Sequence, residues 1–307
     1  MKQYLSIDLG GTIIKVGLVS GGCVIDSTRV AAESDRGLLL RLPAIYEAVG
    51  KLSGHTQEIA GVCMAFPGIV DFPNRKVLAT NAKYDDAPSA DIAGWVSRHW
   101  GVPLVIDNDA RMAMIGEWMY GAGRGTENMV MMTIGTGIGT GVVVDGHPLY
   151  GANGCAGSLG GHLTVDYKGR LCTCGNKGCV ESMGSSFFLP KIIAEDTRLS
   201  QFFRSQAPAM DFKRLTDGYR TGDLDCRIVV EECMDVWAAA IVNYIHAYDP
   251  EKVVIGGGIM RSADIILPRL RQKVYSLAWM PNHKAELCIT QLGDDAALVA
   301  ADYYFEK

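Results

Sequence analysis

Two stretches of this chain repeat one pattern, and the repetition constrains the fold more than any other feature. "IDLGGTIIKVGLVSGG" starts at Ile7, and "TIGTGIGTGVVVDGH" starts at Thr133. Each predicts a strand, a turn rich in glycine and threonine, a second strand and another glycine turn. Glycine turns are common in hairpins, so chance is one explanation. The other is a duplicated domain, with two similar lobes that each offer one Gly-rich turn to a central cleft.

The rest of the chain predicts an α/β protein. Strand-like runs such as "QYLSID", "IAGVCMAF" and "VPLVID" alternate with helical periods at residues 37–52 and 89–99. Further helices are expected at residues 110–121, 227–248 and 295–305. A length of 307 residues accommodates two lobes with a core each. We predict an N-terminal lobe of residues 1–116 plus 292–307 and a C-terminal lobe of residues 117–291.

Charge and composition exclude some classes of function. The formal net charge is −5, with no clustered basic face in the sequence, so we expect no nucleic-acid partner. The opening "MKQYLSIDLGG" has no apolar run of signal-peptide length. The expectation is therefore a cytoplasmic protein without membrane association.

The first Gly-rich turn is a candidate phosphate-binding loop. Glycines at positions 10 and 11 let a ligand approach the backbone, and Thr12 adds a hydroxyl and an amide. Asp8, at the end of a strand, is placed to orient a hydrated Mg²⁺. The alternative is a hairpin turn with a capping aspartate. The candidate residues are Asp8, Gly10, Gly11, Thr12 and Lys15.

Two other glycine clusters follow buried strands. The first of them is the second Gly-rich turn, "GTGIGTG" at residues 135–141. A purely structural hairpin rarely needs so many glycines, which favours phosphate binding at this turn. "KVVIGGG" ends in a triple-glycine turn that either lies against adenosine or only caps its strand. The candidates are Gly135, Thr136, Gly137 and Gly139 in the first cluster and Gly256, Gly257 and Gly258 in the second.

The segment "IDNDARMAMIGEW" places polar residues where a strand ends and a helix begins. One interpretation is a helix N-cap. The other is that Asn108 holds a substrate hydroxyl while Asp109 removes its proton, because phosphoryl transfer depends on positioning and a base. The carboxyl end of a strand is where open α/β sheets place such residues.

A metal site is predicted in "GGHLTVDYKGRLCTCGNKGCVES". His162, Cys172, Cys174 and Cys179 form the Cys₃His set of a closed structural Zn²⁺ site. A closed site leaves no position for a catalytic water, so the expected role of zinc is architectural. Glu181 follows the last cysteine closely, and it is either a sugar-binding carboxylate or a solvated surface residue.

Together these motifs resemble the ROK family of repressors and sugar kinases. The resemblance spans essentially the whole chain, and its most specific element is His162 with "CTCGNKGCVE", followed by "DNDA" and "DLGGT". It implies an actin-like ATPase (ribonuclease H-like) fold, ATP with Mg²⁺ as cofactor, and a structural Zn²⁺. Family members are commonly homodimers or homotetramers.

The resemblance also implies roles for individual residues. Asp109 matches the catalytic base that takes the proton of the sugar's primary hydroxyl. The turns match the phosphate loops, and Gly256 to Gly258 match the adenosine side. The residues that match sugar contacts are Gly68, Asn81, Asn108, Asp109, His162 and Glu181.

Two departures from the family pattern bear on function. Family glucokinases usually read Gly-Glu-x-Gly-His before the zinc site, whereas "AGSLGGH" places Leu159 three residues before His162. A lost carboxylate weakens recognition of particular hydroxyls, so an N-acetylated, epimeric or otherwise altered hexose becomes a candidate substrate beside glucose. Only seven residues precede "DLGGT", so we expect no DNA-binding domain. The leading hypothesis is an ATP-dependent hexose kinase, and the alternative is a sugar sensor with little catalysis.

Overall fold

The computed structural model describes residues 2–53 and 59–306, and the chain divides into two compact α/β units. Unit 1 contains Met1–Gly125, Pro148–Ser158 and Gln291–Lys307, and unit 2 contains Thr126–His147 and Leu159–Thr290. Residues 117–125, 148–158 and 291, which the predicted boundaries assign to the C-terminal lobe, thus belong to unit 1. No helix in the described part of the chain has the length and apolar character that crossing a membrane requires.

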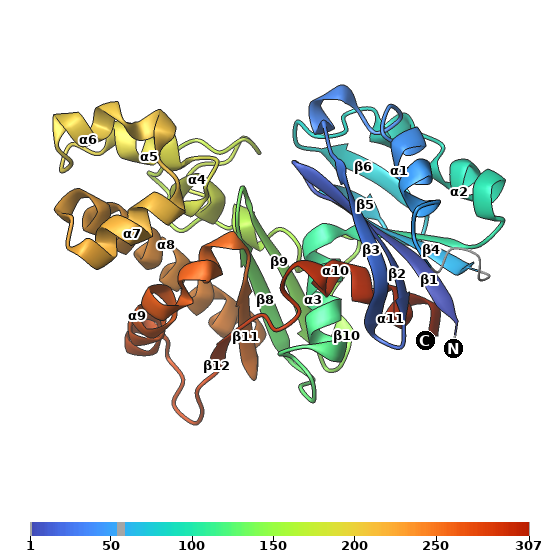
Figure 1. The fold of residues 1–307 in the computed structure, drawn as a ribbon. Helices are drawn as coiled ribbons and strands as arrows, with labels where there is room; N and C mark the ends of the chain where they lie inside the picture. The colour runs from blue at the N-terminus through green and yellow to red at the C-terminus, as the bar shows by residue number, and fades with distance from the viewer. Residues whose placement is uncertain (1, 54–58, 307) are drawn as a thin grey trace. The chain divides into compact units, whose positions relative to one another are not determined.

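Unit 1 is built on a five-stranded sheet with the order β3-β2-β1-β4-β7 (Figure 1). β1 runs antiparallel to β2 and parallel to β4, and β4 runs parallel to β7. A separate hairpin of β5 and β6 lies between β4 and β7 in the chain. The strands are β1 Gln3–Leu9, β2 Ile13–Ser20, β3 Cys23–Ala31, β4 Ile59–Phe66, β5 Gly68–Asp71, β6 Lys76–Thr80 and β7 Leu104–Asn108.

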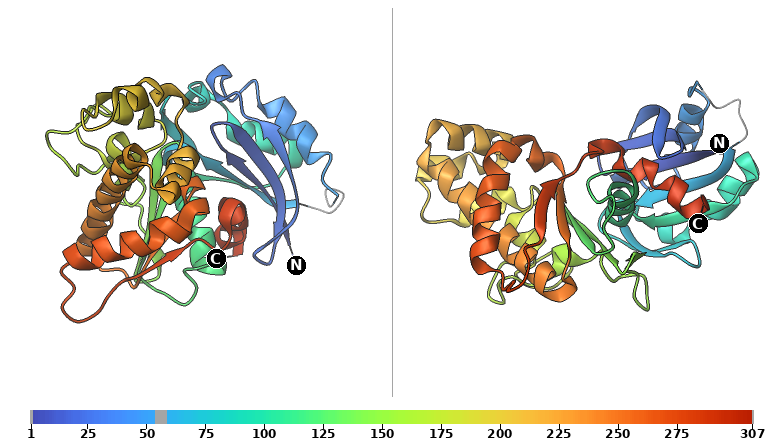
Figure 2. Two further views of the ribbon diagram at one scale, coloured as in Figure 1. Left: turned by 60° about the vertical axis from the view of Figure 1, so that its left-hand side comes forward. Right: turned by 90° about the horizontal axis from the view of Figure 1, so that it is seen from below.

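Alternation along the strands gives this sheet two buried faces. Leu5 and Ile7 of β1 belong to a core that includes residues of α1 Leu42–Val49 and α2 Ile92–Trp100. On the other face Tyr4 stacks on Phe305, with the ring centroids 4.9 Å apart. That face is covered by α3 Asp109–Tyr120, α10 Ala296–Val299 and α11 Ala301–Glu306, as the views in Figures 1 and 2 show.

Unit 2 repeats this topology. Its sheet has the order β10-β9-β8-β11-β12. β8 runs antiparallel to β9 and parallel to β11, and β11 runs parallel to β12. The two stretches that repeat in the sequence therefore form equivalent hairpins, β1–β2 and β8–β9, which favours the duplicated domain over chance. The strands are β8 Met129–Ile134, β9 Ile138–Val144, β10 His147–Pro148, β11 Lys252–Gly256 and β12 Glu286–Ile289.

The helices of unit 2 are centred on α8, whose core side includes the fully buried Trp237. The expected helix at residues 227–248 is longer in the structure, because Asp223 caps an N-terminus at Leu224. The expected helix at residues 295–305 is wrong in one respect: it is divided at Ala300 into α10 and α11. The helices are α4 Val180–Gly184, α5 Leu189–Glu195, α6 Gln201–Ser205, α7 Phe212–Thr221, α8 Leu224–Tyr248 and α9 Ala263–Leu277.

Candidate active site

The junction of β7 and α3 carries the predicted base. The side-chain oxygen of Asn108 accepts a hydrogen bond from the backbone N–H of Arg111 at 3.1 Å, which makes Asn108 the N-cap of α3. Its amide nitrogen donates to Asp109 Oδ1 and to the carbonyl of Gly68, both at 3.1 Å. The capping interpretation of Asn108 is therefore confirmed, and its amide nitrogen links the predicted base to the start of β5.

The charge on Asp109 is destabilised by its surroundings. Burial raises the pKa of its carboxyl from 3.8 to about 6, and the nearby negative charge of Asp8 adds to the rise. The backbone N–H of Ala110 and the positive charge of Lys83 act in the opposite direction. A carboxylate with a pKa near neutrality holds a transferred proton better than an ordinary aspartate, as a general base must.

A buried charge network supports this junction, and our sequence interpretation missed it. The carboxylate of Asp107, fully buried, pairs with Arg111 Nη1 at 2.6 Å. It also accepts hydrogen bonds from the hydroxyls of Tyr150 at 2.8 Å and Tyr304 at 2.7 Å. The i, i+4 spacing of Asp107 and Arg111 is visible in "DNDAR", but the tyrosines come from distant segments. The network anchors the residue immediately before Asn108.

The first Gly-rich turn lies at the same edge of the sheet. β1, β4 and β7 are parallel, and the register pairs Asp8 with Ala65 and Ala65 with Asp107. Their carboxyl ends therefore meet on one side, which brings Asp8 and the turn of Gly10 to Thr12 close to Asp109. Gly68 starts β5, and Asn81 follows β6 with an exposed side chain.

Lys15 is already paired inside unit 1. Its ammonium lies 3.2 Å from Asp8 Oδ2 and donates a hydrogen bond of 2.8 Å to the carbonyl of Asp294. The positive charge of Lys15 lowers the pKa of Asp8, although burial, the larger effect, keeps that pKa above its ordinary value. Lys15 therefore fixes Asp8, and a phosphate contact by Lys15 would have to compete with this ion pair.

In unit 2 the second Gly-rich turn connects β8 to β9. Gly135 to Gly137 form the turn, while Gly139 lies within β9. The turn is held by the backbone N–H of Ser186, which donates to Gly135 at 3.0 Å, and that of Phe187, which donates to Thr136 at 3.0 Å. The N–H of Ile138 donates to Glu181 Oε2 at 2.9 Å. Glu181 is thus a half-buried, hydrogen-bonded carboxylate and not a solvated surface residue.

The triple-glycine turn lies next to the second turn. β8 and β11 are parallel, and Gly256 pairs with Thr133. Gly257 has φ 91°, a left-handed conformation, and a Cβ at this position would lie 2.2 Å from the carbonyl oxygen of Ile134. Only glycine fits there, because backbone approaches backbone. Gly257 and Gly258 bring exposed backbone beside the second Gly-rich turn, which suits a nucleotide, whereas Gly256 is buried.

The four predicted metal ligands come together in unit 2. One ligand atom from each of His162, Cys172, Cys174 and Cys179 lies within 4.8 Å of all the others. The Cys172 Sγ to His162 Nδ1 distance is 3.6 Å, and the Cys174 Sγ to Cys179 Sγ distance is 3.7 Å. Three sulfurs and one imidazole in this arrangement could hold a zinc ion.

The metal cluster is continuous with α4. Gly178 has φ 63° and lies so close to the carbonyl of Asp166 that a side chain would collide with it. This turn lets Cys179 face the other ligands while serving as the N-cap residue of α4. Glu181 follows in the first turn of that helix. The geometry of the cluster therefore determines where the Glu181 carboxylate lies.

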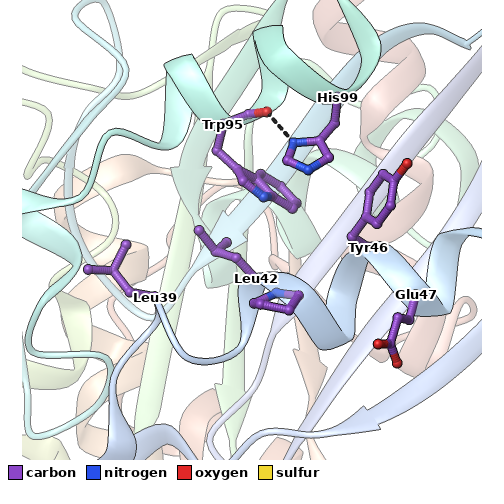
Figure 3. A pocket seen from close by; sticks show the side chains of 7 residues that line it. Leu39, Leu42, Tyr46, Glu47, Trp95 and His99 are labelled. Atoms are coloured by element: carbon purple, nitrogen blue, oxygen red, sulfur yellow. Dashed lines mark hydrogen bonds between the residues drawn. The ribbon is translucent and has the colours of Figure 1, made fainter.

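A separate surface pocket of about 410 Å³ lies between α1 and α2 in unit 1 (Figure 3). The His99 ring and the Trp95 carbonyl on its wall are joined by a hydrogen bond of 2.8 Å. Among the residues that the structure describes, none of the predicted site residues lines it, and Glu47 is the one carboxylate on its wall. It offers no phosphate turn and no paired catalytic groups, so it is not the candidate active site.

Comparisons with known proteins agree with these features. The ROK family matches residues 4–307. A glucokinase of Halalkalibacterium halodurans is 31% identical over 323 aligned positions, which cover 100% of this chain and 96% of that protein. A xylose repressor of Caldicellulosiruptor bescii is 25% identical over an alignment that covers 97% of this chain and 76% of the repressor.

A solved structure has a closely similar fold. It is a ROK family glucokinase of Streptomyces griseus in complex with glucose and AMPPNP. It superimposes with a TM-score of 0.82 and 26% sequence identity, and the match covers 98% of each chain. The predicted actin-like ATPase fold is confirmed by this likeness.

Proposed function

The chain belongs to the ROK family, and we propose that it is a sugar kinase that phosphorylates a hexose or hexose derivative at its primary hydroxyl with ATP. The observation that carries the proposal is the Asp109 carboxylate at the end of β7, hydrogen-bonded by Asn108 and with a pKa raised to about 6. A protein that only binds sugar has no use for such a base.

Asp109 acts as the general base. Its carboxylate accepts the proton of the sugar hydroxyl as the hydroxyl oxygen forms a bond to the γ-phosphorus. The bond between that phosphorus and the β–γ bridging oxygen breaks, and ADP leaves with the electron pair. Asn108 orients Asp109 through its amide nitrogen, and its link to Gly68 ties the base to β5.

The glycine turns bind the nucleotide. Backbone N–H groups of Gly11 and Thr12 in unit 1 and of Thr136 and Gly137 in unit 2 donate to phosphate oxygens. The N–H groups of Gly10 and Gly135 shape the turns instead, because they donate to the carbonyls of Asp8 and Gly137. The turn of Gly256 to Gly258 contacts adenosine. Asp8 would hold hydrated Mg²⁺, which would neutralise phosphate charge.

The sugar is recognised by Gly68, Asn81, Asn108, His162 and Glu181. Leu159 stands where family glucokinases have a carboxylate, so the substrate differs from glucose or is held by other groups at that hydroxyl. The Cys₃His cluster binds a structural Zn²⁺ that fixes α4 and with it Glu181. His162 serves both the metal and the sugar.

The first experiment is an assay of the zinc-loaded protein with ATP-Mg²⁺ against a panel of hexoses and N-acetylhexosamines, following ADP release. Turnover on at least one member supports the kinase. The Asp109→Asn protein should retain sugar binding and lose at least about 10²-fold in kcat. Asp35→Asn, which removes one negative charge from an exposed position in the same unit, is the matched control. Near-normal turnover by Asp109→Asn would remove Asp109 from the base role.

A second candidate function is a sugar sensor, and the likeness to the xylose repressor of C. bescii favours it. A sensor should be stabilised against heat by a sugar but not by ATP-Mg²⁺. If no sugar of the panel gives ADP release, and a sugar but not ATP-Mg²⁺ raises the unfolding temperature, the sensor is favoured over the kinase.

A further inference from the structure

Lys83 lies in a segment whose backbone conformation is costly. Ala82, with φ 55°, and Tyr84, with φ 56°, are both left-handed, although neither is glycine. Each such residue costs on the order of 1 kcal/mol, and conformations of this kind persist only where the surroundings impose them. The backbone on both sides of Lys83 is therefore held in place by other contacts.

Those contacts come from the first Gly-rich turn and its neighbours. Tyr84 is fully buried, and its hydroxyl donates a 2.7 Å hydrogen bond to the carbonyl of Gly10. Its backbone N–H donates to the carbonyl of Ser34 at 2.7 Å, and the Ser34 hydroxyl donates to the carbonyl of Gly11 at 3.0 Å. Hydrogen bonds therefore connect the segment around Lys83 to Gly10 directly and to Gly11 through Ser34.

The side chain of Lys83 lies directly against that turn. A Cβ placed on Gly11 would be 2.9 Å from Lys83 Cε and 3.1 Å from Lys83 Nζ. Lys83 is half-buried, and its ammonium also acts electrostatically on Asp109. The positive charge is therefore beside both the phosphate turn and the base.

Among the described residues, Lys83 lacks the close ion pair that Lys15 makes, and its electrostatic interaction with the Asp109 carboxylate is a longer-range one. Lys15 is paired with Asp8, whereas Lys83 forms no ion pair or hydrogen bond within residues 2–53 and 59–306. A partly desolvated cation is costly unless an anion meets it. The hydroxyls of a neutral sugar do not meet this need, but a phosphoryl group does.

We propose that the Lys83 ammonium contacts the γ-phosphoryl group of bound ATP and stabilises the charge on its oxygens during transfer. This rests on the proposed kinase function and adds to it a catalytic residue that the glycine turns and Asp8 do not account for. Lys83 supplies a point charge and forms no bond to phosphorus, so the proton and electron balance of the transfer is unchanged.

A binding experiment tests this without turnover. Dissociation constants for AMPPNP and ADP, each with Mg²⁺, are measured by calorimetry for wild type, Lys83→Met, Lys83→Arg and Lys76→Met. Lys76 is an exposed lysine of β6 in the same unit and serves as the matched control. Lys83→Met should weaken AMPPNP binding by about tenfold and leave ADP binding within about twofold, because only AMPPNP carries the third phosphate. Lys83→Arg should recover most of the loss.

If Lys83→Met weakens the binding of AMPPNP and ADP equally, or weakens the binding of neither, the assignment of Lys83 to the γ-phosphoryl group is overturned. Failure of the wild type to bind AMPPNP would instead count against the kinase itself. Thermal unfolding of each variant separates loss of a contact from loss of folding, and Lys83→Arg keeps the test informative if Lys83→Met is unstable.

Kinetics on the sugar found by the panel give a second, independent readout. Lys83→Met should lower kcat by about 10²-fold or more with the sugar KM within about threefold, as for loss of a charge contact made in the transition state. A raised sugar KM with unchanged kcat would place Lys83 on an acidic group of the sugar and overturn the phosphoryl assignment.

Discussion

Asp109 combines a fixed position with a raised pKa, and this makes a prediction about pH. A general base must be unprotonated, so kcat/KM for the sugar should fall as pH drops below about 6, the pKa of Asp109. An aspartate at its ordinary pKa would keep the enzyme active well below that pH. The measurement is a pH profile of kcat/KM with stability checked at each pH.

Charges around Asp109 predict how its profile responds to substitution. Lys83 is the side-chain cation that lowers this pKa, and Asp8 is the carboxylate that raises it. Lys83→Met should therefore move the acidic limb to higher pH, whereas Asp35→Asn should leave it in place. An acidic limb near pH 4 in the wild type would contradict the raised pKa of Asp109.

At the scale of elements, the metal cluster, α4 and the second Gly-rich turn form one connected structure. Cys179 adjoins α4, and Glu181 and the residues after α4 hold the turn through backbone hydrogen bonds. Cys172→Ser should therefore release zinc and raise KM for both ATP and sugar by at least about tenfold. Zinc content by atomic absorption and KM for both substrates are the measurements.

Cys23→Ser is the matched control, because Cys23 is an exposed cysteine outside the cluster. It should retain zinc and both KM values. A Cys172→Ser protein that loses zinc but keeps both KM values would contradict the architectural role of the metal.

At the scale of the whole molecule, unit 1 is discontinuous in sequence and needs the C-terminus of the chain. Leu298 and Val299 pack with Val19, and the Tyr304 hydroxyl reaches Asp107. A chain ending at Gly293 should leave this face of the sheet open and unfold at a markedly lower urea concentration than the full chain. Phe305→Ala, which removes the ring stacked on Tyr4, should cost about 2 kcal/mol.

Glu306→Gln, at an exposed position of the same helix, should leave the urea midpoint unchanged. Unfolding followed by circular dichroism measures all three variants. An unchanged midpoint for the chain ending at Gly293 would mean that α10 and α11 are not needed to complete unit 1.

Features encoded by local spacing could be predicted from the sequence. Strand alternation, the helical period at residues 227–248 and the repeated hairpins depend on neighbouring residues, and the structure confirms them within a few positions. The family and the actin-like fold are confirmed by the comparisons. The thiols at positions 172, 174 and 179 could be read as metal ligands because so few residues separate them.

The sequence by itself therefore determined the class of fold and the family, and it predicted the groups of residues that we propose carry the chemistry. Only the tertiary structure decided which distant residues meet: Lys83 lies beside Gly11, and Tyr150 and Tyr304 donate to Asp107. It also decided that Glu181 accepts a hydrogen bond from the backbone N–H of Ile138. Such contacts depend on how strands and helices pack, since residues far apart in the chain carry no local pattern that records their proximity.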